Sequence, residues 1–120
     1  MEVNTLNNVI ISGRLTADPE LKTTPNGVSV CTFIVAVDRN TKEEAADFPV
    51  VVAWRTTAEF VSKYLSKGRK VIVKGEIRTR NYEDKDGNKR KATEIQADRV
   101  EFADSPKQNE SQEGYGYAGY

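Results

Sequence analysis

Apolar residues alternate with polar or small ones along most of this chain, which is the pattern of half-buried β-strands. The pattern predicts five strands, over residues 8–15, 28–37, 48–55, 70–82 and 92–102. In the second predicted strand, Cys31, Phe33, Val35 and Val37 share one face. We therefore interpret Cys31 as a small buried hydrophobe rather than a reactive thiol.

The hydrophobic period changes between the third and fourth predicted strands. Ala58, Val61 and Leu65 fall on one stripe of a helix. Thr56 and Glu59 have the spacing of a capping box, and Gly68 suits the position that follows a helix. We expect a helix of about three turns here.

Turn-forming residues separate the other elements. Residues 18–27 contain Asp-Pro and Pro-Asn-Gly, which are typical of turns, and Asp86-Gly87 is typical of a hairpin. Residues 39–47 form a charged loop. The chain is polar without apolar periodicity from Ala103 on, so we expect one domain over residues 1–103 and a disordered tail over 104–120.

The predicted order is three strands, one helix and two strands. This order is typical of the OB-fold, an all-β, five-stranded Greek-key barrel with one α-helix between the third and fourth strands. Such barrels commonly bind single strands or oligosaccharides on their second and third strands and the neighbouring loops.

The fourth predicted strand has one apolar and one charged face. The apolar face consists of Val71, Val73, Gly75 and Ile77, which we assign to the barrel interior. The opposite face carries Ile72, Lys74, Glu76, Arg78, Arg80 and Tyr82. Because unpaired charges do not fit the core of a small barrel, this second face must lie outside. The sequence does not decide whether Glu76 holds an arginine or keeps ligand binding reversible.

The third predicted strand is ambiguous. Phe48, Val50, Val52 and Trp54 share one side, and Val51 and Ala53 the other. Either side is apolar enough to face the core, so alternation alone leaves Trp54 inside or outside. Outward aromatics beside guanidinium groups would suit nucleobases, since every base has a π-face for stacking.

The formal net charge is zero, but the charges are segregated. Residues 63–91 contain 11 Lys/Arg and 4 Asp/Glu, so the remaining residues carry an equal and opposite excess. Segregation of this kind focuses a positive field on one face of a neutral molecule, although charge runs are usually only solvated surface.

The residue inventory argues against catalysis and membrane insertion. The chain has no histidine, a single cysteine and no phosphate-binding GxxxxGK[ST] loop, and no run of about 18 apolar residues. We expect no enzyme activity, no cofactor and no metal. The N-terminus lacks the features of a secretion signal, and the lone cysteine fits a cytoplasmic location.

Six collinear stretches carry a family resemblance over about residues 7–102. They are NNVIISGRLTADPELKTTPNG, FIVAVDR, ADFPVVVAW, TAEFVSKYLSKG, KGEIRTRNYEDKDGNK and TEIQADRVEF. In these stretches the chain resembles the bacterial and phage single-stranded DNA-binding proteins of the replicative type. The resemblance implies a cytoplasmic, nucleoid-associated OB-fold protein, usually a homotetramer. It also implies wrapping of single-stranded DNA with little sequence preference, in replication, recombination and repair.

The resemblance also implies site residues. The stacking aromatics fall on Phe48, Trp54 and Tyr82, and the basic positions on Lys22, Lys67, Arg78 and Arg80. By location and face we add Arg55 and Lys74. Asn8, with Asn7, lies in the first-strand region, where the family pairs subunits and touches DNA.

Two departures from the family pattern stand out. Pro49-Val50 follows the first aromatic, where the family has a non-proline and a polar residue, so we expect a drier spot beside Phe48. The sequence ends in YGYAGY rather than in the acidic-hydrophobic tip that recruits replication and repair proteins. We expect either that the tip has been removed or that this is a phage or accessory paralogue.

Three other functions remain as alternatives. An OB-fold module can prefer RNA or tRNA, or can use the same face as a protein-interaction module in replication assembly. A nuclease or other hydrolase is the last alternative, and no spacing of carboxylates or lysines favours it.

Overall fold

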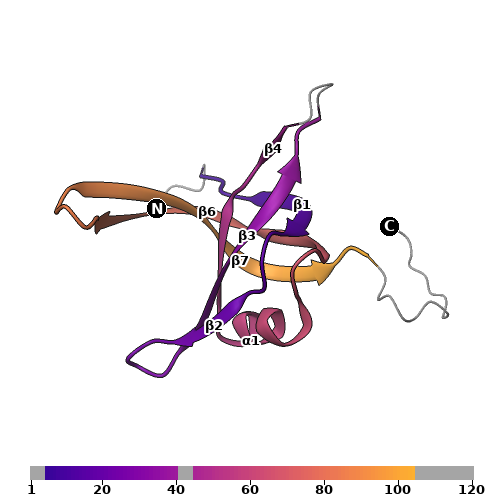
Figure 1. Cartoon of the computed structure of the whole chain (residues 1–120), viewed down its shortest axis with the longest axis horizontal. Helices are drawn as coiled ribbons and strands as arrows, with labels where there is room; N and C mark the ends of the chain where they lie inside the picture. Colours follow the sequence, from indigo (N-terminus) through magenta and orange to yellow (C-terminus); the bar gives the residue numbers. More distant parts are fainter. Residues whose placement is uncertain (1–4, 41–44, 105–120) are drawn as a thin grey trace.

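The structure, a computed structural model, describes residues 5–40 and 45–104. Its elements are β1 (Val9–Leu15), β2 (Glu20–Thr23), β3 (Ser29–Asp38), β4 (Ala46–Asp47), β5 (Val50–Trp54), α1 (Arg55–Tyr64), β6 (Lys70–Glu83) and β7 (Lys89–Phe102). The five predicted strands are therefore present as β1, β3, β5, β6 and β7 (Figure 1). The last begins at Lys89 rather than Ala92.

The strands close into a ring in the order β1-β6-β7-β5-β3, and β3 returns to β1. Closure rests on the antiparallel pairs Arg14↔Ala36 and Leu15↔Val35. β5 and β7 run parallel, whereas the other neighbours are antiparallel. With one helix between β5 and β6, this is the all-β barrel of the OB-fold, as predicted.

The barrel core consists of inward-facing aliphatic residues, one cysteine and one aromatic residue. Cys31, Phe33 and Val35 from β3 are buried, as their shared face predicted. Burial in these apolar surroundings raises the pKa of the Cys31 thiol, so it stays protonated and unreactive. α1 contributes Ala58 and Val61 to the same core, so the helix packs against the barrel.

The helix exists, but its predicted caps are wrong. α1 follows β5 directly, its N-cap is Trp54, and no side chain caps it. Glu59 instead accepts a hydrogen bond from Ser29 Oγ (3.2 Å). Gly68 does not follow the helix immediately, because Leu65 is the C-cap. It lies in the next turn, with a φ of 87°.

Both predicted turns are confirmed. Gly27 and Gly87 have φ values of 84° and 81°, which suit glycine. However, Glu20–Thr23, predicted as part of a turn, forms β2 and pairs with β3. All four β2 residues are exposed, so no hydrophobic alternation marks this strand. The charged loop likewise contains the short strand β4.

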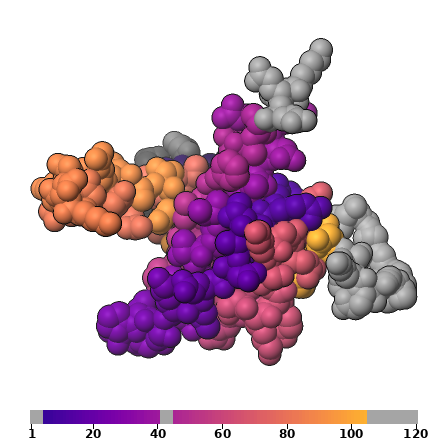
Figure 2. All heavy atoms as spheres, in the orientation of Figure 1, coloured from indigo at the N-terminus to yellow at the C-terminus, as the bar shows by residue number. Residues whose placement is uncertain are grey.

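Three hairpin arms stand out from the barrel: β6–β7, β2–β3, and the end of β3 with β4 (Figures 1 and 2). The β6–β7 arm explains a wrong prediction. Ile77 is 46% exposed rather than inside the barrel. Pairing of β1 with β6 ends at Val9↔Gly75, so β6 leaves the barrel wall before Ile77. The Asn7 amide continues the ladder, accepting from Ile77 N and donating to Ile77 O.

The described chain ends beside the barrel. Ala103 N donates to Lys70 O (2.8 Å), and the Asp104 carboxylate accepts from Lys70 N and Arg69 Nε. Asp104, predicted to belong to the tail, is thus held by β6 and the turn before it. Residues 105–120 lie outside the described residues, so the predicted disorder of the tail stays a prediction.

Candidate nucleic-acid interface

Burial shows which side chains of β5 face outward. Val51 and Ala53 are fully buried, whereas Trp54 is 39% exposed and Phe48 60% exposed. The alternative that alternation left open is therefore settled: Trp54 faces outward. Val50 and Val52 lie half-buried on this same outer surface.

Strand register places other side chains on the same surface. Residues paired directly across neighbouring strands point to the same face of a sheet. Lys22 pairs with Val30, and Val30 pairs with Trp54. Arg78 pairs with Glu94 on the neighbouring β7. The sheet thus displays one tryptophan between a lysine-bearing arm and an arginine-bearing arm.

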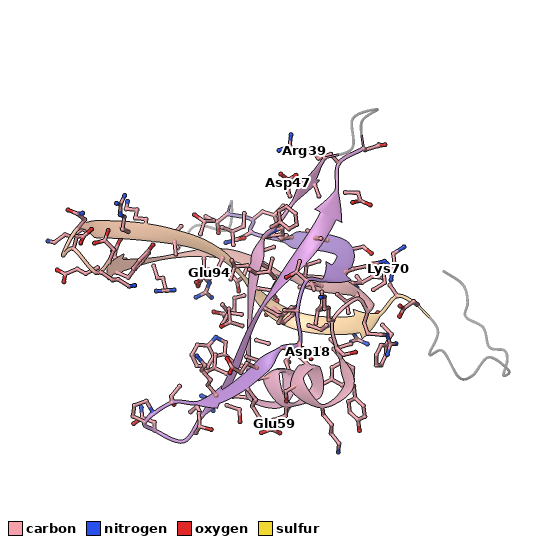
Figure 3. All side chains as sticks on the ribbon, viewed as in Figure 1. Asp18, Arg39, Asp47, Glu59, Lys70 and Glu94 are labelled. Atoms are coloured by element: carbon pink, nitrogen blue, oxygen red, sulfur yellow. The ribbon has the colours of Figure 1, made fainter. Side chains whose placement is uncertain are left out.

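An open groove of about 460 Å³ lies on this surface. Its less polar wall comes from β3 and β5 and consists of Val30, Thr32, Val52 and Trp54. Its polar wall comes from β6 and β7 and consists of Arg78, Thr79, Arg80, Glu94 and Gln96. Figure 3 shows Glu94 where the β6–β7 arm leaves the barrel. An aromatic wall facing a guanidinium wall can hold a base on one side and a phosphate on the other.

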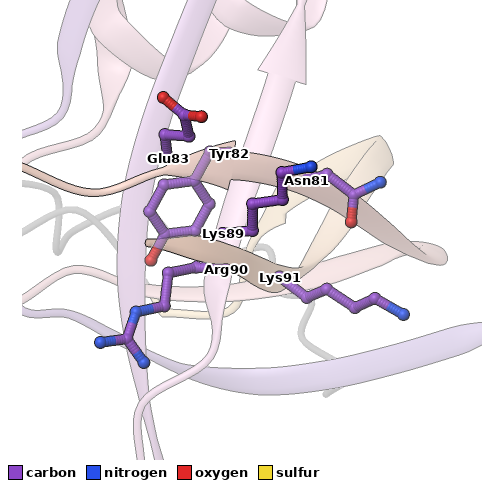
Figure 4. Close-up of a pocket in the computed structure, with 6 residues that line it drawn as sticks. All are labelled: Asn81, Tyr82, Glu83, Lys89, Arg90 and Lys91. Carbon is purple, nitrogen blue, oxygen red and sulfur yellow. The ribbon is translucent and has the colours of Figure 1, made fainter. Parts of the chain in front are cut away.

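A second hollow, of about 530 Å³, lies farther out on the β6–β7 arm (Figure 4). Its lining residues are Asn81, Tyr82, Glu83, Lys89, Arg90 and Lys91. Tyr82 is 42% exposed and pairs across the strands with Arg90. We did not single out Lys89, Arg90 or Lys91 from the sequence. The segregation of positive charge in residues 63–91 was the signal for them, but it marks no individual residue.

Most cations of the two hollows have carboxylate partners. Arg78 Nη2 lies 3.3 Å from Glu76 Oε2, and Arg80 Nε lies 3.0 Å from Glu94 Oε2. Glu76 is thus paired with an arginine, while its role in ligand binding stays open. The arginine side chains of both pairs are more than half exposed, so the pairs add little to stability.

Two further ion pairs lie on the arms. Arg90 Nε donates to Asp84 Oδ2 (3.0 Å), and Arg39 Nη2 donates to Asp47 Oδ1 (2.8 Å). Hydrogen bonds from Asn88 and Arg90 lower the pKa of Asp84. The hydrogen bonds from Arg39 lower the pKa of Asp47 in the same way. Both carboxylates therefore stay charged well into acid.

The remaining predicted site residues lie outside the two hollows. Phe48 precedes β5, and Asn8 precedes β1; both are exposed. Lys74 is exposed on β6 and pairs with Ile10 of β1. Arg55 begins α1 with a φ of 58°, an uncommon value outside glycine, and so turns the chain sharply after Trp54. Lys67 is exposed, and its backbone N–H donates to Asp18 Oδ1 (2.8 Å). Lys22 also lines neither hollow, and the roles of all ten predicted site residues stay predictions.

The described residues contain no candidate metal centre. Among residues 5–40 and 45–104, no three His, Cys, Asp or Glu side chains lie together as metal ligands would. The helix described here, α1, is too short to cross a membrane.

The model of the single-strand binding protein family matches residues 6–103. The chain belongs to this family. It is 45% identical over 115 residues to a single-stranded DNA-binding protein of Clostridium tetani, covering 92% of this chain and 79% of the relative. Single-stranded DNA-binding protein 2 of Staphylococcus aureus is 50% identical over 101 residues, covering 81% and 72%. Single-stranded DNA-binding protein 3 of Listeria innocua is 49% identical over 108 residues, covering 87% and 67%. The resemblance inferred from six motifs is thereby confirmed.

Proposed function

We propose that this family member binds single-stranded DNA with little sequence preference and protects it during replication, recombination and repair. The observation that carries the proposal is the groove between Trp54 and the two arginines Arg78 and Arg80. Binding of this kind breaks no bond in the DNA, so we propose a protein without catalytic activity. The cytoplasm, in association with the nucleoid, is the location we expect from the family.

Stacking on the groove's aromatic wall explains why sequence matters little. Trp54 presents its ring on the outer surface, and any base has a π-face to place against it. Tyr82 offers a second ring on the β6–β7 arm, and Phe48 a third beside β5. A strand that follows these rings would cross the barrel from one arm to the next.

Arg78 and Arg80 are the residues that would bind the DNA phosphates. Arg78 and Arg80 keep more than half of their side-chain surface exposed, although each has a carboxylate partner. A guanidinium has five N–H donors, so donors remain for phosphate oxygens. Because phosphate contacts release counterions, affinity should fall steeply as salt rises.

Fluorescence tests the proposal directly, because Trp54 is the single tryptophan of the chain. We expect saturating oligo-dT at low salt to quench it, and rising salt to reverse the quench. Unchanged fluorescence, or binding that ignores salt, would contradict the proposal.

The variant Trp54→Ala separates stacking from general attraction. We expect it to lose about 1–3 kcal/mol of oligo-dT binding free energy, measured by filter binding or anisotropy of labelled DNA. Tyr64→Ala is the matched control, since Tyr64 is an exposed aromatic on α1 that lines neither hollow. Its affinity should stay at the level of the unsubstituted protein.

Competition distinguishes the alternative ligands. Oligo-dT should displace poly-U and tRNA from the protein at equal nucleotide concentration. Displacement in the opposite direction would favour an RNA-binding module. Weak binding of every nucleic acid, together with a strong protein complex in a pull-down, would favour the assembly module.

We also propose a homo-oligomer, with the homotetramer expected from the family. β1 pairs with β6 along Val9–Arg14, but with β3 only at Arg14 and Leu15. The first residues of β1 therefore pair with β6 on one edge only, and within the described residues no strand pairs with the other edge. Leu6 and Ile10 are 90% and 59% exposed beside this edge. An unpaired edge with apolar residues favours pairing with a second copy.

A further inference from the structure

A carboxylate lies inside the groove that is proposed to receive a polyanion. Glu94 is the most covered acidic partner among the ion pairs of the outer surface, with a side chain only 14% exposed. The corresponding value is 32% for Glu76 and 24% for Asp84. A negative charge here repels phosphates, so its position calls for a compensating role.

The contacts of Glu94 point to that role. Its Oε2 accepts from Arg80 Nε at 3.0 Å. The guanidinium carbon of Arg80 also lies 5.3 Å from the centre of the Tyr82 ring, within the range of a cation–π contact. Arg80 therefore contacts both a carboxylate and a ring, while 58% of its side-chain surface stays open to solvent.

We propose that Glu94 is a positioning residue for DNA binding, which acts by fixing Arg80 beside Tyr82. The inference rests on the proposed function and deepens it. Arg80 would meet a phosphate next to the base that stacks on Tyr82. Glu94 raises the affinity for single-stranded DNA, although its own charge opposes binding.

Two opposing effects decide whether Glu94 raises or lowers the affinity for DNA. An arginine that is already held loses less conformational freedom when it binds a phosphate, so holding it favours binding. Repulsion between Glu94 and phosphates acts across a solvent-exposed groove, where water and salt weaken it. Glu94 is far less exposed than Arg80, so its side chain has less freedom to lose and is a suitable anchor for the more exposed arginine.

The variant Glu94→Gln separates the two effects, because they predict opposite results. If Glu94 positions Arg80, the affinity of the Glu94→Gln variant for oligo-dT is about two- to tenfold lower than that of the unsubstituted protein. The dependence of this affinity on salt is also shallower. If only charge matters, removing a negative charge raises the affinity. Unchanged or raised affinity would overturn the proposal.

Glu101→Gln is the matched control. Glu101 lies on the same strand, forms an ion pair with Arg99 and lines neither hollow. Its substitution removes the same charge and the same kind of pair away from the groove. The affinity of the Glu101→Gln variant for oligo-dT should be unchanged or slightly raised.

A double-mutant cycle tests whether Glu94 acts through Arg80. Arg80→Lys keeps the positive charge but has no Nε–H to be held in a planar fork. In the Arg80→Lys background, Glu94→Gln should cause no further loss of affinity. A loss of the same size in both backgrounds would show that Glu94 acts on the fold or on DNA directly, and would overturn the proposal.

A measurement without DNA keeps this inference separate from the proposed function. The Arg80 Nε proton should be shifted and protected from exchange in the NMR spectrum of the free protein. Glu94→Gln should reduce both features, because a neutral amide oxygen is a weaker acceptor than a carboxylate. Equal exchange in the two proteins would overturn the positioning role. Failure of the unsubstituted protein to bind oligo-dT would instead overturn the proposed function.

Discussion

At the scale of single residues, the backbone leaves no room for a side chain at Gly13 and Gly75, two positions of the barrel wall. Gly75 pairs with Ala97 next to a register shift that leaves Asp98 of β7 unpaired. A Cβ on Gly75 would lie 2.0 Å from Gln96 O, which is a backbone atom and cannot move away alone. The sequence predicted that Gly75 faces inward, but it carried no sign of this contact.

Gly75→Ala is therefore expected to destabilise the protein by about 1–3 kcal/mol or more, measured by urea unfolding. Gly87→Ala is the control, because Gly87 has the unfavourable φ of 81° but nothing within 4 Å of a Cβ. It should cost only about 1 kcal/mol. Equal losses for the two variants would contradict the steric explanation.

At the scale of elements, Asp84 organises the end of the β6–β7 arm. Its Oδ1 accepts from the backbone N–H groups of Asp86 and Asn88, and its Oδ2 accepts from Arg90 Nε. Protonation removes the charge that these donors stabilise, which is why they lower the pKa of Asp84. The carboxylate thus ties the turn to the hollow that contains Tyr82.

The lowered pKa predicts an acid-sensitive arm. In the unfolded chain an aspartate has a pKa of about 3.9. The stabilisation of the folded arm by the Asp84 carboxylate is therefore complete above that pH. This stabilisation is lost as the pH falls through the lower pKa that Asp84 has in the folded state. We expect the Asn88 amide signal to be constant from neutral pH to about 4 and to shift below it in NMR titrations. Asp84→Asn should abolish this transition, whereas Asp86→Asn should keep it.

At the scale of the whole molecule, the exposed edge of β1 is the feature that a single barrel leaves unpaired. Light scattering at micromolar concentration should give a multiple of the 13.4 kDa chain mass. Ile10→Glu should lower this mass, because a charge on an exposed strand opposes edge-to-edge pairing. Tyr64→Glu, which places the same charge on α1, should not change it. A monomer mass for the unsubstituted protein would contradict the proposed oligomer.

Much of the fold could be predicted from the sequence, because the period of alternation is a local property. It predicted the main strands, the helix between β5 and β6, the buried face of β3 and the charged outer face of β6. The strand β2 could not be predicted, since an exposed four-residue strand depends on pairing with β3 rather than on its own pattern. The capping box failed because β5 runs straight into α1 with Trp54 as the N-cap.

The site divides in the same way. By itself the sequence determined that Tyr82 shares a face of β6 with Arg78 and Arg80. It also predicted that Phe48 shares a face with Trp54, although Phe48 precedes β5 in the structure. Only the tertiary structure decided that Trp54 faces outward, since both sides of β5 are apolar and the barrel buries Val51 and Ala53. It also decided that Ile77 lies outside and that Glu94 meets Arg80. The physical reason is that alternation depends on neighbours along the chain, whereas burial and ion pairs depend on neighbours in space.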